Sequence, residues 1–438
     1  MHSLYLHIPF CRHRCAYCDF NTYAGQEDLI PAYVDALCRE IEFVGSQLPS
    51  PPGRGAGGEG RVHTIYFGGG TPSLLTAGQF EKILAAIREN FEVLFDAETS
   101  LEANPGTVSL TYLRGLHDMG FNRLSLGVQS AHADELRQLE RSHDFFDVIE
   151  AVKLARMAGF DNLNLDLIYG LLEQPLDRWQ ATVKLALGLH PEHLSLYALT
   201  IEHGTPFGRW SARGRMPSPD PDLAADMYEW AGEYLSEQGY EQYEISNWAR
   251  SKDEGGRRKA EENFHPSSFI LSPSYACRHN LQYWRNQPFL GFGAGAHGWA
   301  GGYRYSNVLR IKTYIERLAD GGWQACPERS RRVAKGEFPL SPATVKHQRI
   351  TAKVEMQETM LTGLRLTREG VSDADFRSRF GIGIEDAFPE EVSELLRLDL
   401  VEWVSTPPSY ASRITHHALR LTPRARLVAN QVFMRFVD

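Results

Sequence analysis

The stretch from Tyr5 to Phe20, YLHIPFCRHRCAYCDF, places three cysteines within eight residues, directly after a short apolar run. They have the spacing C-x3-C-x2-C and are Cys11, Cys15 and Cys18. The chain has six cysteines in all, too few for a disulfide scaffold, so this compact group of thiols predicts a metal site. No second ligand pair follows at the spacing usual for structural zinc. Three thiolates suit a [4Fe–4S] cluster with one open iron, although spacing alone leaves zinc and unligated thiols as alternatives.

The composition of the 438-residue chain is that of a globular protein, with 42% hydrophobic and 23% charged residues. Its formal net charge of −9 argues against a general basic surface for nucleic acid. The sequence contains no apolar run of about 18 residues, and its first ten residues lack the charged segment and long apolar core of a signal peptide. We therefore expect a cytoplasmic protein that does not bind nucleic acid and is not an integral membrane protein.

Short apolar or β-branched runs alternate with amphipathic stretches in the first half of the chain. Six strands are predicted, over Ser3–Ile8, His63–Phe67, Glu98–Ala103, Arg123–Val128, Asn162–Ile168 and His193–Leu199. Helical patterns cover Leu29–Val44, Ala77–Asn90, Leu110–Met119, Asp147–Ala158 and Leu176–Gly188. This alternation predicts an α/β protein with a parallel sheet, specifically a partial (β/α)6 barrel. Cys38 lies beside the apolar stripe of its helix and is expected to be a buried structural thiol.

Polar motifs occur where the predicted strands end. The cysteines follow the first strand and Gly68–Pro72 follows the second. Glu102 ends the third strand, Gln129 follows the fourth, and Asp166 lies late in the fifth. The chemistry of such barrels is found at the carboxyl ends of the strands. We therefore expect these motifs to meet in one site.

The domain organisation follows from the remaining patterns. We expect a barrel domain over residues 1–310, a linker or insertion over 311–349 and a smaller C-terminal domain over 350–438. Segments 49–61, 251–274 and 327–349 have the composition of surface insertions. The C-terminal residues combine helical patterns with short hairpin-like runs, which predicts a mainly helical, winged-helix-like domain. Its 11 Lys and Arg residues against 13 Asp and Glu disfavour contact with DNA.

The motifs taken together resemble the radical S-adenosylmethionine (SAM) superfamily. Within it, the chain is similar to the group that contains oxygen-independent coproporphyrinogen III oxidase and the heme chaperone HemW. Besides the cysteine stretch, the resemblance rests on Gly68–Leu74, Glu102–Gly106, Leu126–Ser130, Arg141, Asp166–Gly170, Tyr243–Asn247 and Gly293–His297. The glycines at 291, 293 and 295 do not form a dinucleotide-binding fingerprint, because the spacing and the downstream acidic residue are absent.

The resemblance implies a role for each motif, with no residue assigned as catalytic. Cys11, Cys15 and Cys18 would ligate three irons of the cluster, and SAM would chelate the fourth. Reduction of SAM by the cluster would yield methionine and a 5′-deoxyadenosyl radical, with the electron coming from a donor protein. The residues implied in SAM binding or in lying against SAM and the cluster are Tyr5, Tyr17, Gly69, Gly70, Thr71, Glu102, Gln129, Arg141 and Asp166. Arg141 would pair with a carboxylate, and Asp166 would accept from ribose hydroxyls.

Three features favour the chaperone branch over the oxidase branch. The oxidase has a further cysteine two residues after the third, where this chain has Phe20, and an N-terminal extension that is absent before Cys11. The segment His279–Trp284 also resembles the H-N-x2-Y-W motif associated with heme binding in that branch. A neutral imidazole is a good heme ligand, so His279 is the candidate, with the Cys277 thiolate as a competitor.

The resemblance thus implies a SAM-binding [4Fe–4S] heme chaperone with heme as a further cofactor. Its partners would be acceptor hemoproteins, including membrane-associated respiratory proteins. The alternative is an enzyme that converts coproporphyrinogen III to protoporphyrinogen IX by radical SAM oxidative decarboxylation. Whether the chain is an enzyme is therefore left open at this point, with the chaperone preferred.

Overall fold

The protein is described by a computed structural model that covers residues 1–48, 61–251, 273–319, 340–406 and 416–437. Two compact units are present, and each is described by itself. The first comprises residues 1–191, 196–227 and 288–349, and the second comprises 192–195, 228–287 and 350–438. The expected boundary between residues 349 and 350 agrees with this division, but the one at 310 does not, and residues 192–195 and 228–287 of the expected barrel domain belong to the second unit. The reason is packing, because Tyr243, Ala276 and Leu281 share a buried apolar cluster with Leu366.

The six predicted strands are present and lie side by side in the order of the sequence. They are β1 (His2–Ile8), β4 (Arg61–Gly69), β5 (Glu92–Ala103), β6 (Arg123–Gln129), β7 (Leu163–Tyr169) and β8 (His193–Ala198). The pairs from β1 to β7 are parallel, with Leu4 opposite Ile65 and Leu101 opposite Leu124. The expected α/β fold with a partial barrel is confirmed.

The sheet continues beyond β1 with strands that the sequence patterns did not predict. These are β11 (Phe289–Phe292), β12 (His297–Ala300), β13 (Tyr303–Asn307) and β14 (Thr344–Arg349). β11 pairs parallel with β1, and the next three strands are antiparallel. The expected insertion over 327–349 is therefore wrong for its last six residues, which form β14. The expected insertions 49–61 and 251–274 lie almost wholly outside the described residues.

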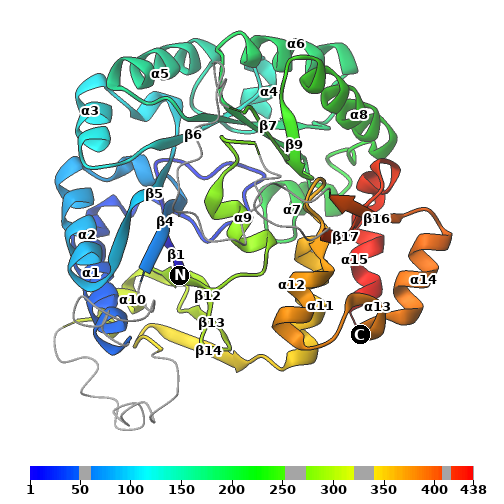
Figure 1. Ribbon diagram of the computed structural model, residues 1–438. Coiled ribbons are helices and arrows are strands. Elements are labelled where there is room, and N and C mark those ends of the chain that lie inside the picture. The colour runs from blue at the N-terminus through cyan, green and yellow to red at the C-terminus, as the bar shows by residue number, and fades with distance from the viewer. Residues whose placement is uncertain (49–60, 252–272, 320–339, 407–415, 438) are drawn as a thin grey trace, which may run out of the picture. The chain divides into compact units, whose positions relative to one another are not determined.

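Helices cover the outer face of the sheet in the first unit (Figure 1). They include α1 (Ile30–Gln47), α2 (Ala77–Asn90), α3 (Leu110–Asp118), α5 (Phe145–Ala158) and α6 (Leu176–Leu187). The unit also contains α4 (Ala133–Gln138), α7 (Pro206–Ala212) and α10 (Ile311–Arg317). Local sequence explains several boundaries. Thr76 and Gln79 form a capping box that starts α2, and Gly159 ends α5 in the left-handed conformation. Cys38 is buried on α1, as expected.

The core of the first unit lies between the sheet and these helices. Leu4, Leu6 and Ile8 of β1 are fully buried, and Phe67, Phe80 and Phe121 pack edge to face or tilted between β4 and the helices. Strands of a parallel sheet covered by helices are expected to be apolar along both faces. Two short strands, β2 (Phe10–Cys11) and β3 (Tyr23–Ala24), pair with each other at the two ends of the cysteine loop.

The second unit combines helices with two small groups of strands. Its helices are the part of α8 (Pro221–Glu237) from Tyr228 onward, α9 (Arg278–Trp284), α11 (Ala352–Gly363), α12 (Asp373–Phe380), α13 (Ile384–Ala387), α14 (Pro389–Arg397) and α15 (Ala429–Phe433). β9 (Glu241–Glu244) and β10 (Asn247–Ala249) pair antiparallel. β15 (Val371–Ser372), β17 (His416–Leu421) and β16 (Val401–Thr406) form a three-stranded sheet beside the helices, as the winged-helix-like pattern predicts. Within the described residues no helix combines the length and the apolar composition needed to cross a bilayer.

Candidate functional site

A cavity of about 460 Å³ lies in the first unit at the carboxyl ends of the parallel strands. Its walls come from the cysteine loop, from the ends of β4 to β7, and from residues between 197 and 202 at the end of β8 and just beyond it. The site residues that the sequence predicts and that line it are Cys11, Cys15, Tyr17, Cys18, Gly69, Gly70, Thr71, Glu102, Gln129, Arg141 and Asp166. The expectation that these motifs meet in one place therefore agrees with the structure.

The three cysteines of the loop carry free thiols, and each has a polar group beside its sulfur. Thr71 Oγ1 lies 3.6 Å from Cys11 Sγ, Thr22 Oγ1 lies 3.9 Å from Cys18 Sγ, and Arg141 Nη1 lies 3.6 Å from Cys15 Sγ. Burial raises the pKa of the Cys11 thiol to about 11. Metal ligation requires thiolates, so binding of iron must offset the cost of ionising the buried Cys11 thiol.

The residues present fit an iron–sulfur cluster. Three sulfur donors line one cavity on a short loop, and soft thiolates are the ligands that such clusters require. Among the residues that the structure describes, no three His, Cys, Asp or Glu side chains are grouped to hold a single metal ion. The cluster assignment rests on the donor set and its shared cavity.

The segment after β4 approaches the cysteine loop so closely that glycine is needed. Gly69 has φ of +115°, and a Cβ there would overlap the imidazole of His7. A Cβ on Gly70 would lie 2.6 Å from the Phe10 carbonyl oxygen. The N–H groups of Gly69, Gly70 and Thr71 already donate to protein acceptors. An ammonium group is itself a hydrogen-bond donor, so one bound here would use carbonyl oxygens of this segment as acceptors.

Glu102 stands half-buried at the end of β5, in the wall of the cavity. Its carboxylate accepts from the Tyr66 hydroxyl at 2.8 Å and from the Gly69 N–H at 3.0 Å. Burial, with a smaller contribution from the nearby Asp166 charge, raises the pKa of Glu102 to about 7. A carboxyl that titrates near neutral pH in a cavity is poised to respond to a cationic ligand.

Arg141 and Asp166 are both held by side chains that the sequence analysis did not single out. Arg141 Nη2 donates to Asn104 Oδ1 at 2.6 Å and to the Gly127 carbonyl at 2.8 Å. Asp166 accepts from Ser125 Oγ at 2.8 Å and from Asn164 Nδ2 at 2.9 Å. The protein thus surrounds Arg141 with neutral oxygens and the Cys15 thiol, and its pairing with a carboxylate stays a prediction.

The two tyrosines predicted to lie near SAM differ in position. Tyr17 lines the cavity, and burial raises its pKa well above the usual range. Tyr5 does not line the cavity but stacks on Tyr66, which does, with 6.3 Å between ring centroids. Its hydroxyl donates to His7 Nδ1 at 3.0 Å, because His7 Nε2 donates to the Asn21 carbonyl. Tyr5 therefore supports the wall of the cavity from behind.

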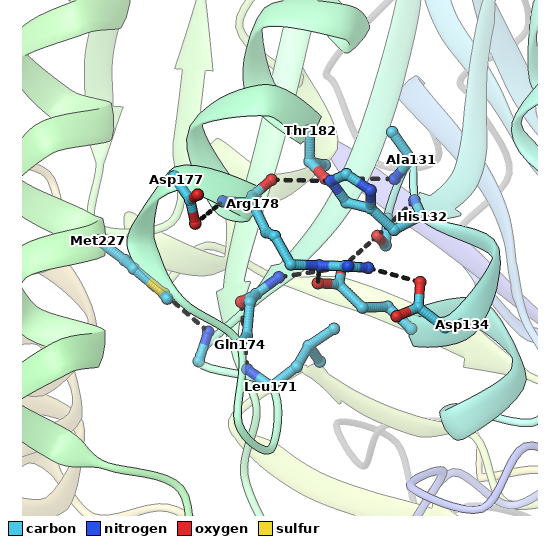
Figure 2. A network of polar contacts seen from close by, with 12 residues as sticks. Ala131, His132, Asp134, Leu171, Gln174, Asp177, Arg178, Thr182 and Met227 are labelled. Carbon is cyan, nitrogen blue, oxygen red and sulfur yellow. Dashed lines mark hydrogen bonds and ion pairs between the residues drawn. The ribbon is translucent and has the colours of Figure 1, made fainter.

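Figure 2 shows a polar network around Ala131, His132 and Asp134, which lie in the segment between Gln129 and Arg141. Gln129 has φ of +67°, an unusual value for a residue with a side chain. Between the two residues, the buried carboxylate of Glu135 on α4 accepts from Arg178 Nε at 2.9 Å and from Gln174 Nε2 at 3.1 Å. The network connects the turn after β6 to the start of α6. Gln129 and Arg141, which both line the cavity, are therefore supported by the same network.

His279 lies on α9 in the second unit and does not line this cavity. Its imidazole is buried, and Nε2 lies 2.9 Å from the Tyr283 hydroxyl, one helical turn further on. Cys277, the competing candidate, is fully buried at the start of the same helix. Trp284 packs against the Arg365 guanidinium at 4.3 Å.

The fold and the cysteine-lined cavity define a radical SAM protein. The sequence profile of the radical SAM superfamily matches residues 5–186, and the profile of the HemN C-terminal domain matches residues 350–403. The cofactors that this class implies are a [4Fe–4S] cluster and SAM. The solved structure of Escherichia coli coproporphyrinogen III oxidase (HemN), a radical SAM enzyme, covers 99% of this chain and 89% of its own with a TM-score of 0.72. At 24% sequence identity, this likeness establishes the fold.

The chain belongs to the family of the heme chaperone HemW. It is 33% identical to the Bacillus subtilis heme chaperone over 438 residues, covering 99% of that protein. It is 38% identical to the Escherichia coli heme chaperone over 299 residues, which is 68% of this chain and 69% of that protein. The mitochondrial radical S-adenosyl methionine domain-containing protein 1 of Bos taurus is 35% identical over 68% of this chain.

Proposed function

We propose that this chain binds heme and passes it to acceptor hemoproteins. The observation that carries the proposal is the full-length similarity to a heme chaperone, at 33% identity over all 438 residues. Several further heme chaperones are 31–38% identical to the chain. The family and the radical SAM fold thus support the same function, that of a heme carrier which also binds the cluster and SAM.

Phe20 supports the choice of the chaperone over the oxidase. It occupies the position of the fourth cysteine in the oxidase pattern C-x3-C-x2-C-x-C. Its side chain is 63% exposed and forms part of the cavity wall beside Cys18. An aromatic ring in that place supplies an apolar contact surface but no thiol. A step that depends on a fourth cysteine could not proceed in the same way.

His279 is the residue that we propose as the heme ligand. A neutral imidazole nitrogen binds heme iron well, and here Nε2 already has the Tyr283 hydroxyl as a partner. Because His279 is buried, heme ligation requires this part of α9 to open and the hydrogen bond to Tyr283 to break. Tyr283 and Trp284 would then be free to contact the porphyrin.

Further expectations belong to the same proposal. The cluster and SAM together supply one-electron chemistry, and the cavity residues orient SAM and exclude water from it. The cluster requires an electron donor, and the heme acceptors would include membrane-associated respiratory proteins. The five described cysteines are all free thiols, which suits a reducing cytoplasm as the location.

The test is an anaerobic heme titration followed by transfer to an apo-hemoprotein, with and without SAM. The same reconstituted protein is assayed in parallel for conversion of coproporphyrinogen III. We expect stoichiometric heme binding and transfer, with no sustained production of protoporphyrinogen IX. Sustained turnover of coproporphyrinogen would establish the oxidase instead, and absence of heme binding would refute the chaperone.

A further inference from the structure

The cysteine loop is fastened at its end by a single asparagine. Asn21, three residues after Cys18, donates from Nδ2 to the carbonyl oxygens of Ala294 at 3.0 Å and Leu309 at 3.1 Å. Both partners are acceptors, so the amide nitrogen must face them. The Asn21 carbonyl in turn accepts from His7 Nε2 at 3.0 Å. One residue thus joins the loop to β1 and to two segments almost 300 residues away.

The receiving segment is shaped for this contact. Gly295 has φ of +80°, and a Cβ there would overlap the side-chain amide of Asn21. The turn that contains Gly293 and Gly295 therefore lets the asparagine reach the backbone. This assigns a purpose to the run from Gly293 to His297, which the SAM site itself does not use. Tyr23 adds a second bond to the Leu309 carbonyl at 3.2 Å.

The segments that supply these two carbonyls are themselves held by a buried carboxylate. Glu40 on α1 accepts from the Gly293 N–H at 2.8 Å and from Asn307 Nδ2 at 2.8 Å. The Tyr314 hydroxyl at 2.7 Å and the Ser341 hydroxyl at 2.6 Å complete its partners. Asn307 Nδ2 also donates to the Gly293 carbonyl at 3.0 Å. Glu40 therefore holds together Gly293, which precedes Ala294, and Asn307, which lies two residues before Leu309.

We propose that Asn21 is a positioning residue for the iron–sulfur cluster, anchored through Ala294 and Leu309 to the Glu40 carboxylate. A loop with three ligands in eight residues holds a cluster only if its backbone keeps the sulfurs in place, within roughly 0.5 Å. Groups that fix ligand segments tune metal retention in other sites by 10- to 100-fold. β2 fixes the start of the cysteine loop at Cys11, and Asn21 fixes its end after Cys18.

The test is Asn21→Asp, which keeps the shape but turns the donor into an oxygen facing two carbonyls. The matched control is Asn122→Asp, because Asn122 Nδ2 also donates to a backbone carbonyl, that of Ala97 at 2.8 Å, before β6. Both proteins are reconstituted anaerobically as full chains. Iron and sulfide per chain, the rate of cluster loss to a chelator, and the electron paramagnetic resonance spectrum of the reduced cluster are measured. The unfolding temperature of each apo-protein is recorded alongside.

We expect Asn21→Asp to lose its cluster at least tenfold faster than the parent chain and to show an altered resonance spectrum. Asn122→Asp should retain the parent values at a comparable or lower unfolding temperature. Glu40→Gln, which removes acceptor capacity one step further back, should accelerate cluster loss by a smaller factor. Parent-like retention and spectrum in Asn21→Asp would overturn the proposal. So would cluster loss that follows the unfolding temperature equally in Asn21→Asp and Asn122→Asp.

Discussion

The Nε2 atom of His279 and the hydroxyl of Tyr283 are hydrogen-bonded at 2.9 Å, with the two rings edge to face at 85°. The pair is formed by residues one turn apart on α9, so it is a local feature of the motif His279–Trp284. If iron binds at Nε2, the hydroxyl and the metal compete for the same nitrogen. The hydrogen bond then opposes heme binding.

Tyr283→Phe should therefore strengthen heme binding. A neutral hydrogen bond contributes about 0.5–1.5 kcal/mol, so removing the competitor should lower the Kd for heme by about 2- to 10-fold. The measurement is an anaerobic heme titration followed by absorbance. His279→Ala is the companion variant and should change the spectrum of the bound heme. A weaker binding in Tyr283→Phe would mean that the hydroxyl supports the heme, and an unchanged spectrum in His279→Ala would place the ligand elsewhere.

Removal of one loop thiol should abolish the cluster. Cys15→Ala leaves two sulfur ligands, and we expect the reconstituted protein to lose the visible absorption of a [4Fe–4S] cluster. Cys38→Ala is the control, because Cys38 is a buried thiol on α1 and outside the cavity. It should keep the full absorption and the full iron content. Equal spectra in the two variants would refute the ligand assignment.

The affinity for SAM should depend on pH through Glu102. Its pKa is raised to about 7 by burial, so the carboxyl is mostly protonated below that pH. SAM carries positive charge and favours the ionised carboxylate, so binding must release a proton when the pH is below about 7. Affinity should therefore fall by up to about tenfold per pH unit on the acidic side and level off above it. Calorimetry in buffers of different ionisation enthalpy measures the proton release, and Glu102→Gln should remove it. A pH-independent affinity in the parent chain would contradict this role.

Loss of Arg178 should destabilise the support behind Gln129 and Arg141. Arg178→Met leaves the buried Glu135 carboxylate without its cation, which costs about 2 kcal/mol in the free energy of unfolding. The control is Lys153→Met, which breaks an exposed ion pair to Glu150 on α5 and should cost less than about 0.5 kcal/mol. Urea denaturation of the apo-proteins compares the two. Similar losses in both variants would show that the network in Figure 2 contributes no more than a surface pair.

Much of the fold could be predicted because its signals are local. The helix Ala77–Asn90 was predicted to the residue, since its capping box and apolar spacing are adjacent in sequence. The six predicted strands are apolar runs between helices, a pattern that needs no distant information. β14 was missed because its residues, TVKHQR, are mostly polar and five of the six are exposed. Only its pairing with β13 makes it a strand.

The residues of the site likewise divide into those that sequence patterns reveal and those that they do not. Cysteines, glycines and strand-end acids carry recognisable spacing, and the cavity unites them. The residues that orient them carry no such signal. Nothing in the sequence distinguishes Ser125 from other strand residues, yet its hydroxyl donates to Asp166 on the neighbouring strand. Asn21 follows the cysteine motif directly, but its acceptors become neighbours only after the sheet has closed around β1 and β11.

The pairing of β1 with β11 also limits when, during synthesis of the chain, the cysteine loop can be fixed in place. The cysteines leave the ribosome almost 300 residues ahead of Ala294 and Leu309, the partners of Asn21. At 5–20 residues per second, roughly 15 to 60 s separate the two events. During that interval the nascent loop has its thiols but neither β11 nor the carbonyls that restrain it. Stable loading with iron and sulfide is therefore expected to follow synthesis, and a released chain of only the first 290 residues or so should be a poor acceptor for a cluster.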